Sequence, residues 1–329
     1  MSFGTGPDVF ALGTFSHNGG APYPGLVVDD QVGDLRTEFG DHATTMDLFE
    51  SWDGTLERLR ALAAAELTDP RPLQDLRPLP PIQPLGQVMC AGANYRSHTI
   101  EQLFVVARKA LGETRSDNEL WAEAEATVSQ RAAEGTPFMF VAQASAISGA
   151  QDDVVLWGPG VEHDWEVELA VVIGRPARNV SPEHALTHVA GYTISNDIST
   201  RDVMFRPTFR LSDFMRSKLR PGFFPTGPYV VPREFVSDYR RLRITLKLNG
   251  QVMQDESVDD MTYGVEQLIS YASTLTDLHP GDLLLTGSPA GNAAIHGDRW
   301  LRPGDVMESA ITGLGAQRNL CVADPHPTA

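Results

Sequence analysis

The sequence is poor in the residues and patterns that mark several large classes of protein. It has only two cysteines, Cys90 and Cys321, both in apolar strand-like stretches, which excludes a disulfide framework and a cysteine zinc site. Its 26 basic residues face 43 acidic ones, and the net charge of −17 argues against binding to nucleic acid or to an anionic membrane. It shows no basic-then-apolar leader and no apolar run of about 18 residues. These absences predict a globular protein of the cytoplasm.

Several catalytic motifs are missing as well. The chain has no Gly-rich phosphate loop, no dinucleotide fingerprint, no Gly-x-Ser-x-Gly elbow and no His-Glu-x-x-His helix. Its apolar fraction of 42% and charged fraction of 21% are typical of a folded protein. The 329 residues are enough for a sizeable core and, at roughly 150 residues per domain, for two units.

The pattern of residues 1–84 predicts a small α/β domain followed by a linker. We expect a strand in "VFALGTF", a hairpin turning at Asp29 and Asp30 in "GLVVDDQVGDL", and a helix in "TLERLRALAAAEL". Residues 68–84 are dense in proline, which disfavours both a helix and a central strand. They are therefore expected to link the first unit to a second domain at residues 85–329.

The second domain is expected to be rich in strands that do not alternate regularly with helices. Helices are predicted in "IEQLFVVARKAL", "NELWAEAEATVSQRAAEG" and "GVEQLISYASTL". Strands are predicted around residues 153–157, 166–174, 189–195, 228–232, 242–248, 282–286 and 305–311. This order favours an α+β fold with a mostly antiparallel or mixed β core over a doubly wound sheet.

The stretch "HDWEVELAVVIG", residues 163–174, places carboxylates at the start of a buried strand. Glu166 and Glu168 are two residues apart, so both point to one face of the strand, with Asp164 beside them. Asp197 lies where the strand in "GYTISNDISTRD" is expected to end. A Mg²⁺ or Mn²⁺ ion would neutralise the repulsion, because hard cations prefer oxygen ligands. The alternative is a solvated strand start and a turn-capping Asp, and spacing alone leaves both open.

A second candidate pair lies in "AGANYRSHTIEQLF". His98 and Glu101 are three residues apart, which places them on one face at the start of a helix. A carboxylate near an imidazole orients the ring and suits it to act as a general base. The same spacing is also common in an ordinary solvated helix turn.

Seven segments of the chain occur in a characteristic order: "NYRSHTIEQ", "DWEVELAVVIGR", "HVAGYTISNDISTRD", "FPTGPYVV", "LNGQVMQDESVDDMTYGVEQLISYAS", "LHPGDLLLTGSPAG" and "LRPGDVMESAITGLG". Over roughly residues 85–322 they resemble the successive motifs of the fumarylacetoacetate hydrolase family. The resemblance implies a metal-dependent enzyme of acylpyruvate-type 2-oxo acids, built on a mixed β-roll and assembled as a homodimer. Some members of that family also carry a smaller N-terminal domain.

The resemblance also assigns roles to individual residues. It implies that Mg²⁺ or Mn²⁺ is held by Glu166, Glu168 and Asp197. It places a His-x-x-Glu catalytic dyad at His98 and Glu101, on a mobile lid of about residues 98–135. It implies substrate-binding roles for Arg201, Lys218 and Ser288.

Three departures from the family pattern concern substrate recognition. Ala142 stands where many relatives carry a lysine, and Pro221 stands where they often have an aspartate. The stretch between Glu101 and Phe138, where the lid is expected, is longer than in the shorter members.

The predicted chemistry is hydrolytic cleavage of a C–C bond in an acylpyruvate. A cation that chelates the 2-oxo acid would stabilise the departing enolate, while His98 activates water. The same enolate stabilisation would serve an isomerase of 2-hydroxyhepta-2,4-diene-1,7-dioate type, as in aromatic catabolism, or an oxaloacetate decarboxylase. A non-catalytic binding or structural descendant of the fold is the alternative from a different class. The sequence leaves these open, because they differ in substrate length and access of water and not in ligands.

Overall fold

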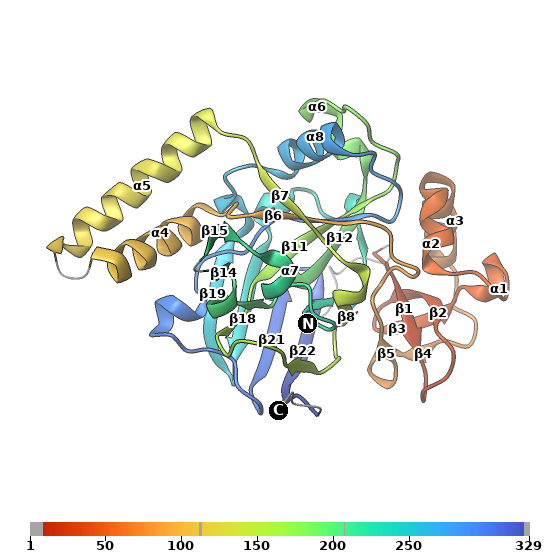
Figure 1. Cartoon of the computed structure of the whole chain (residues 1–329). Helices are drawn as coiled ribbons and strands as arrows, with labels where there is room; N and C mark the ends of the chain where they lie inside the picture. Colours follow the sequence, from red (N-terminus) through yellow and green to blue (C-terminus); the bar gives the residue numbers. More distant parts are fainter. Residues whose placement is uncertain (1–8, 112–113, 207, 326–329) are drawn as a thin grey trace.

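The computed structural model describes residues 9–111, 114–206 and 208–325, and three larger sheets carry most of its strands (Figure 1). Residues 1–8 of the predicted first domain, and residues 112–113 of the predicted lid, lie outside the described residues. One cluster of buried apolar side chains runs from Phe10, directly before the first strand, to Cys321 near the C-terminus. Both cysteines are buried and free. None of the described helices combines the length and the apolar character needed to cross a membrane.

The first sheet is antiparallel, and its strands follow the order β4-β3-β2-β1-β5. The hairpin turn at Asp29 and Asp30 is confirmed, since both residues have positive φ, as a two-residue hairpin turn of type I′ requires. The proline-rich stretch supplies both edge strands, where a missing amide hydrogen is tolerated. The elements are β1 (Ala11–Ser16), β2 (Tyr23–Val28), β3 (Gln31–Asp34), α1 (Arg36–Phe39), α2 (Thr45–Glu50), α3 (Trp52–Ala64), β4 (Arg71–Pro72) and β5 (Arg77–Pro78).

The central sheet is mixed and carries the strands that build the candidate site. Its order is β7-β6-β20-β11-β12-β16-β8, with β17 paired to β12, and the β20–β6 and β16–β8 pairs are parallel. Strands β11 and β12 are buried along their whole length, as expected for the middle of a covered sheet. The strands are β6 (Val88–Gly92), β7 (Phe138–Ala142), β8 (Ile147–Gly149), β11 (Val167–Ile173), β12 (Val189–Asn196), β16 (Phe224–Thr226), β17 (Val231–Pro232) and β20 (Leu283–Leu285).

The third sheet, with the order β19-β18-β21-β22-β9, packs against the central one. Buried and exposed residues alternate along β22, so one face of this sheet is covered. Gln317 on β22 bridges the two sheets, because its Nε2 donates to the carbonyls of Ile194, Pro225 and Gly227. The strands are β9 (Val154–Leu156), β18 (Arg243–Leu248), β19 (Gln251–Ser257), β21 (Val306–Ile311) and β22 (Gly315–Ala323), with two ribbons formed by β10 (His163–Asp164) with β13 (Ser199–Thr200) and by β14 (Phe205–Arg206) with β15 (Phe209–Ser212).

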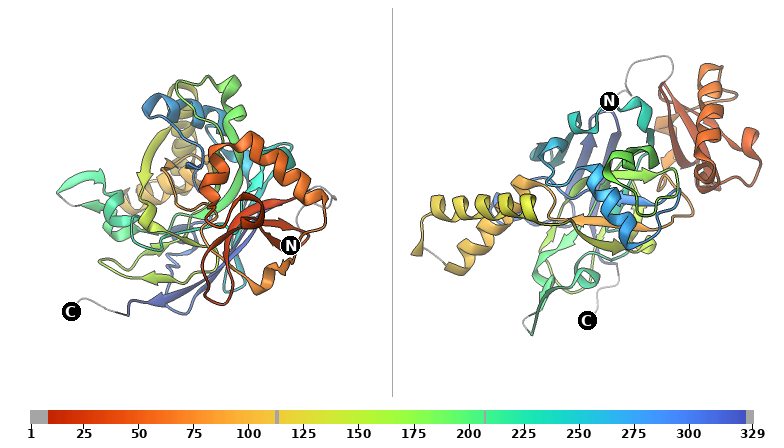
Figure 2. Two further views of the ribbon diagram at one scale, coloured as in Figure 1. Left: turned by 90° about the vertical axis from the view of Figure 1, so that its right-hand side faces the viewer. Right: turned by 90° about the horizontal axis from the view of Figure 1, so that it is seen from above.

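A helical hairpin, α4 (Arg96–Leu111) and α5 (Asp117–Glu134), projects from the body at the end opposite the N-terminal sheet (Figure 2). It has a small apolar cluster of its own, formed by Ile100, Ala124 and Val128 with Leu103 and Trp121 packed against them. The remaining helices are α6 (Pro182–Ala185), α7 (Phe214–Ser217) and α8 (Val265–Leu275). The expected α+β fold with a mixed β core is confirmed, whereas the division between residues 84 and 85 stays a prediction.

Candidate active site

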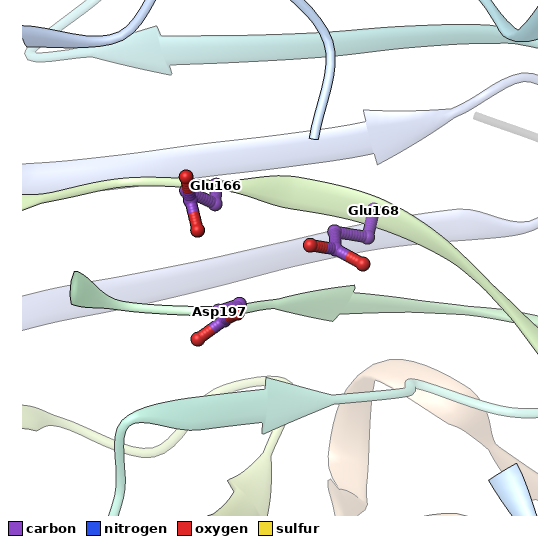
Figure 3. A group of neighbouring side chains, drawn as sticks. All are labelled: Glu166, Glu168 and Asp197. Carbon is purple, nitrogen blue, oxygen red and sulfur yellow. The ribbon is translucent and has the colours of Figure 1, made fainter. Parts of the chain in front are cut away.

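The three predicted metal ligands meet at the end of β12 (Figure 3). β11 and β12 are antiparallel with Val167 opposite Asn196, and the Asp197 amide donates to the Glu166 carbonyl at 2.9 Å. This register brings Asp197 beside Glu166 and Glu168, whose side chains share one face. One carboxylate oxygen from each of the three residues lies within 4.8 Å of the others, and all three side chains are buried.

Two cations reach into this acidic triad. Lys218, directly after α7, lies between two carboxylates, with its Nζ 2.5 Å from both Oε2 of Glu166 and Oδ2 of Asp197. Arg201 donates from Nη2 to Oε1 of Glu166 at 2.7 Å and from Nε to Oδ2 of Asp164 at 2.8 Å. Two of the three residues predicted to bind substrate, Lys218 and Arg201, therefore line the triad, and in this structure their charges are directed at its acids.

The charges of the cluster do not balance, because four buried carboxyl groups face two cations, the buried Lys218 and the partly buried Arg201. Burial, and then the charges of Asp197 and Glu166, raise the pKa of Glu168 well above its ordinary value. Burial also raises the pKa of Asp197 to about 7, although Lys218 opposes this. Burial disfavours ionised Glu166 too, but the charges of Arg201 and Lys218 prevail and hold its pKa well below the usual range.

These observations fit a divalent cation at the triad. Among the described residues, Oδ1 of Asp197 is buried without a hydrogen-bond partner. A carboxylate oxygen left bare in the interior is costly, and a hard cation is the ligand that would satisfy it. Two positive charges would also offset the surplus of carboxylates.

His98 lies in the first turn of α4 with its Nε2 3.6 Å from Oε1 of Glu166. Burial lowers the pKa of His98 to about 4 in spite of that carboxylate, so the ring is neutral at pH 7. Its Nδ1 has no hydrogen-bond partner within the described part of the chain. Glu101, one turn later, accepts a hydrogen bond from the Gly291 amide at 2.9 Å. The two residues share a face of α4 as their spacing predicts, but Glu101 bonds this loop and not the imidazole.

The loop around Gly291 depends on glycine. Gly291 has a φ of 95°, and a Cβ there would lie 2.1 Å from the Met253 carbonyl. The Gly291 carbonyl accepts a hydrogen bond from the Trp165 indole at 3.0 Å, and the Gly291 amide donates one to the Glu101 carboxylate. The backbone is therefore held from both sides, and it places the next residue, Asn292, beside His98.

Asn292 and Gln102 also line the site, although no motif in the sequence pointed to them. Asn292 is buried and donates from Nδ2 to the Trp165 carbonyl at 2.5 Å, while its Oδ1 has no partner among the described residues. Gln102 lines the cavity next to His98. Asn292 directly follows the segment "SPAG", so a polar residue after this glycine turn was the available signal.

The triad opens into a cavity of about 210 Å³. Ser288 lines it and accepts a hydrogen bond from Nε2 of Gln254 at 3.1 Å. Phe138, Phe140 and Phe214 contribute to the apolar part of its wall. Ala142 is buried at the end of β7, and Pro221 follows Arg220 at the turn before β16, so neither supplies a charged group to this cavity.

Comparison with models of known families matches residues 87–322 to the C-terminal domain of fumarylacetoacetate (FAA) hydrolase. The chain belongs to the fumarylacetoacetate hydrolase family. The resemblance drawn from the seven segments is thereby confirmed, and with it the expectation that the protein is an enzyme of this family.

Members of the family that resemble the chain differ in their reactions. Over 280 residues it is 31% identical to the mitochondrial oxaloacetate tautomerase FAHD2A of Bos taurus, covering 85% of this chain and 80% of the relative. Over 236 residues it is 35% identical to the 2,4-didehydro-3-deoxy-L-rhamnonate hydrolase of Sphingomonas sp. (strain SKA58), covering 71% and 72%. The fold matches maleylpyruvate hydrolase of Sphingobium sp. SYK-6, solved with manganese(II) and pyruvate, at a TM-score of 0.72 and 23% identity over 95% of this chain and 99% of that one.

Proposed function

We propose that the protein is a divalent-metal-dependent enzyme of 2-oxo and 2,4-dioxo carboxylic acids, and that it cleaves a C–C bond of an acylpyruvate by hydrolysis. The observation that carries the proposal is the buried acidic triad with too little positive charge, next to a neutral His98 in the same cavity. The 35% identity to a sugar-acid hydrolase of the family supports the hydrolytic reaction.

Glu166, Glu168 and Asp197 would hold the cation, Mg²⁺ or Mn²⁺, because all three offer oxygen ligands from one small volume. When bound, such an ion supplies Lewis-acid stabilisation of negative charge on the oxygen of the substrate enolate. The cations Lys218 and Arg201 lie close enough to the triad to pair with the carboxylate of a 2-oxo acid. Ser288 offers a hydroxyl in the lining of the same cavity.

His98 is the group suited to move the proton. Its low pKa leaves a ring nitrogen free to accept a proton from water at pH 7. The hydroxide attacks the distal carbonyl and forms a C–O bond, and the bond between that carbon and the pyruvate carbon then breaks. His98 returns the proton to the pyruvate part, so the products are a carboxylic acid and pyruvate. Glu101 contributes by fixing the Gly291 loop, which holds Asn292 at the ring.

The helical hairpin is proposed to act as a lid. Residues 98 to about 135 include α4, which carries His98 into the site, and α5, which packs on α4 through the hairpin's own small cluster. Segments with few contacts to the main core are the ones that open and close over a site. Amide exchange in α4 and α5 should slow when oxalate binds to the Mg²⁺-loaded protein. Equal exchange with and without oxalate would remove the lid role.

A panel of substrates tests the reaction. Metal-stripped protein is reconstituted with Mg²⁺ or Mn²⁺ and offered acylpyruvates, oxaloacetate and 2-hydroxy-dienoic acids in water enriched in ¹⁸O. Hydrolysis should depend on the metal and place one ¹⁸O in the carboxylic acid product. Failure to turn over any member of the panel while metal is bound would favour a non-catalytic descendant of the fold.

Tautomerisation is a second candidate, favoured by the 31% identity to an oxaloacetate tautomerase over 85% of the chain. It needs the same stabilised enolate and a proton carrier but no attacking water. Keto–enol interconversion of oxaloacetate, followed by its ultraviolet absorbance, together with no cleavage of acylpyruvates, would decide for it. Isomerisation of a hydroxy-dienoate or decarboxylation of oxaloacetate would show as a product without ¹⁸O.

A further inference from the structure

A second cavity, of about 380 Å³, adjoins the triad cavity. The two share part of their lining, so a ligand held at the triad can extend from one into the other. The shared side chains are His98, Gln102, Arg201, Met204 and Phe205. An engineered apolar cavity of roughly 150 Å³ admits benzene, so this one has room for a group larger than a phenyl ring.

The wall of the second cavity is mostly apolar. α4 contributes Val105 and Val106, the 3-10 helix η9 (Ala293–His296) contributes Ala294 and Ile295, and Trp300 lies nearby. Ile295 and Val106 remain partly open to solvent although they are large apolar side chains. An apolar surface left uncovered beside a catalytic centre is typical of a binding site for an apolar ligand.

The charged groups of this cavity disfavour an anionic ligand. Of the described residues that line it, the cations are Lys109 and Arg201, and both are paired, with Asp298 at 3.3 Å and with Asp164 at 2.8 Å respectively. Glu162 also lines it, and burial together with the charge of Asp202 raises the pKa of this carboxyl. Glu101 and Asp164 line it as well, and Arg201 is already assigned to the 2-oxo acid end, so a second carboxylate would meet mainly acidic side chains, which disfavours it.

We propose that the second cavity binds the distal group of the substrate and selects an uncharged, apolar acyl chain over one that ends in a carboxylate. The inference rests on the proposed function, because the triad must hold the 2-oxo acid end. This preference would distinguish the protein from an enzyme that acts on oxaloacetate, because that four-carbon dicarboxylate would leave the second cavity unfilled.

N-alkyl oxamates test the proposal, since they are unreactive analogues of 2-oxo acids whose tail length can be varied. Calorimetry on Mg²⁺-loaded protein should show affinity rising roughly fourfold for each buried methylene until the cavity is full. A tail of equal length that ends in a carboxylate should bind at least tenfold more weakly than the alkyl tail.

Two variants with matched exposure sharpen the measurement, because Ile295 and Leu320 are both 36% exposed. Ile295→Lys places a cation in the cavity wall and should reverse the preference, so that the carboxylate tail binds better than the alkyl tail. Leu320→Lys, on β22 and outside both cavities, should leave the preference as in the parent.

Failure of tail binding and failure of the proposed function would give different results. If oxamate without a tail binds but affinity stays flat along the series, or if both variants change the preference equally, the second cavity does not take the tail. If oxamate fails to bind at all and acylpyruvates are not turned over, it is the proposed function that is wrong.

Discussion

The buried carboxylate of Asp305 and the buried carboxylates of the triad have opposite surroundings. Asp305, just before β21, accepts hydrogen bonds from the Arg299 guanidinium, from Nδ2 of Asn249 and from the Arg302 amide, each at 2.7 Å. Burial alone would raise the pKa of Asp305, but these bonds lower it below the ordinary value. At the triad, burial raises the pKa of both Glu168 and Asp197.

Asp305 is bound by groups of the folded chain, whereas the acids of the triad are arranged to bind a ligand. The partners of Asp305 come from its own turn and from Asn249 in the turn between β18 and β19, so the folded chain satisfies it. Asp197 keeps a buried oxygen without a partner in the described part of the chain. A buried oxygen without a partner destabilises the folded protein, and a bound cation would remove this cost.

The largest expected effect is on metal affinity. Glu168→Gln keeps the shape of the side chain but removes one negative charge from the triad. Two unit charges about 4 Å apart interact by roughly 4 kcal/mol at an effective dielectric constant of 20, and the double charge of Mg²⁺ or Mn²⁺ enlarges this, so the ion should bind at least about a thousandfold more weakly. Calorimetric titration measures this directly.

The Asp305→Asn variant is the control for that experiment. Asp305→Asn also removes a buried carboxylate, but one that the chain already satisfies, and it should bind metal as the parent does. An unchanged affinity in Glu168→Gln would remove Glu168 from the ligand set.

The next effect concerns the neutral imidazole beside the triad. His98→Ala should leave metal binding intact and lower hydrolysis by about 10²–10⁴-fold, the contribution typical of a general base. Any decarboxylation of oxaloacetate should fall far less, because it needs no attacking water. Steady-state rates of both reactions on one preparation give the ratio, and an equal loss of both would show that His98 only places the substrate.

A smaller effect is expected on the structural side of the comparison. Asp305→Asn should lower the free energy of unfolding by about 1–3 kcal/mol at pH 7, since bonds to a buried carboxylate are lost. The pKa of Asp305 is depressed in the folded state. Its contribution is therefore present above the unfolded value of about 3.9 and is lost as the pH falls through the lower folded value. Urea unfolding at pH 7 and pH 3 should show the two proteins converging in acid; a constant difference would contradict the assignment.

The smallest effect is expected at Ser288 in the lining of the triad cavity. Ser288→Ala removes a hydroxyl whose neighbour Gln254 keeps its bonds to the Pro289 and Ala290 carbonyls, so the fold should be unaffected. One lost neutral hydrogen bond of about 1 kcal/mol should raise the KM of the preferred 2-oxo acid about fivefold. A KM within experimental error of the parent would take Ser288 out of the substrate site.

The triad was predictable because its geometry follows from strand periodicity. Residues two apart share a face, and a buried apolar run marks the strand, so Glu166 and Glu168 were placed together from sequence alone. The register of β11 against β12 then brings in Asp197, and this depends only on two adjacent strands. Spacing also pointed to His98 and Glu101, whereas Arg201, Lys218 and Ser288 came only from the family resemblance, and Asn292 and Gln102 from neither.

Other parts depend on contacts between distant segments. The bond from Gly291 to Glu101 joins the loop after β20 to α4, and no local pattern encodes that approach. Asn292 reaches His98 for the same reason. Edge strands of two residues, such as β4 and β5, are too short to show an alternation. The cytoplasmic location and the homodimer stay predictions.

The separate apolar cluster of the α4–α5 hairpin affects how the sequence of such a protein can vary during evolution. Ile100, Ala124 and Val128 pack on one another and not into the main core. A piece of chain that satisfies its own apolar surface can be inserted, lengthened or trimmed without repacking the sheets beneath it. Most of α4 is tied to the two cavities through residues from His98 to Lys109, so natural variation in α5 and at the far end of the hairpin can remodel the entrance while the metal site is inherited unchanged.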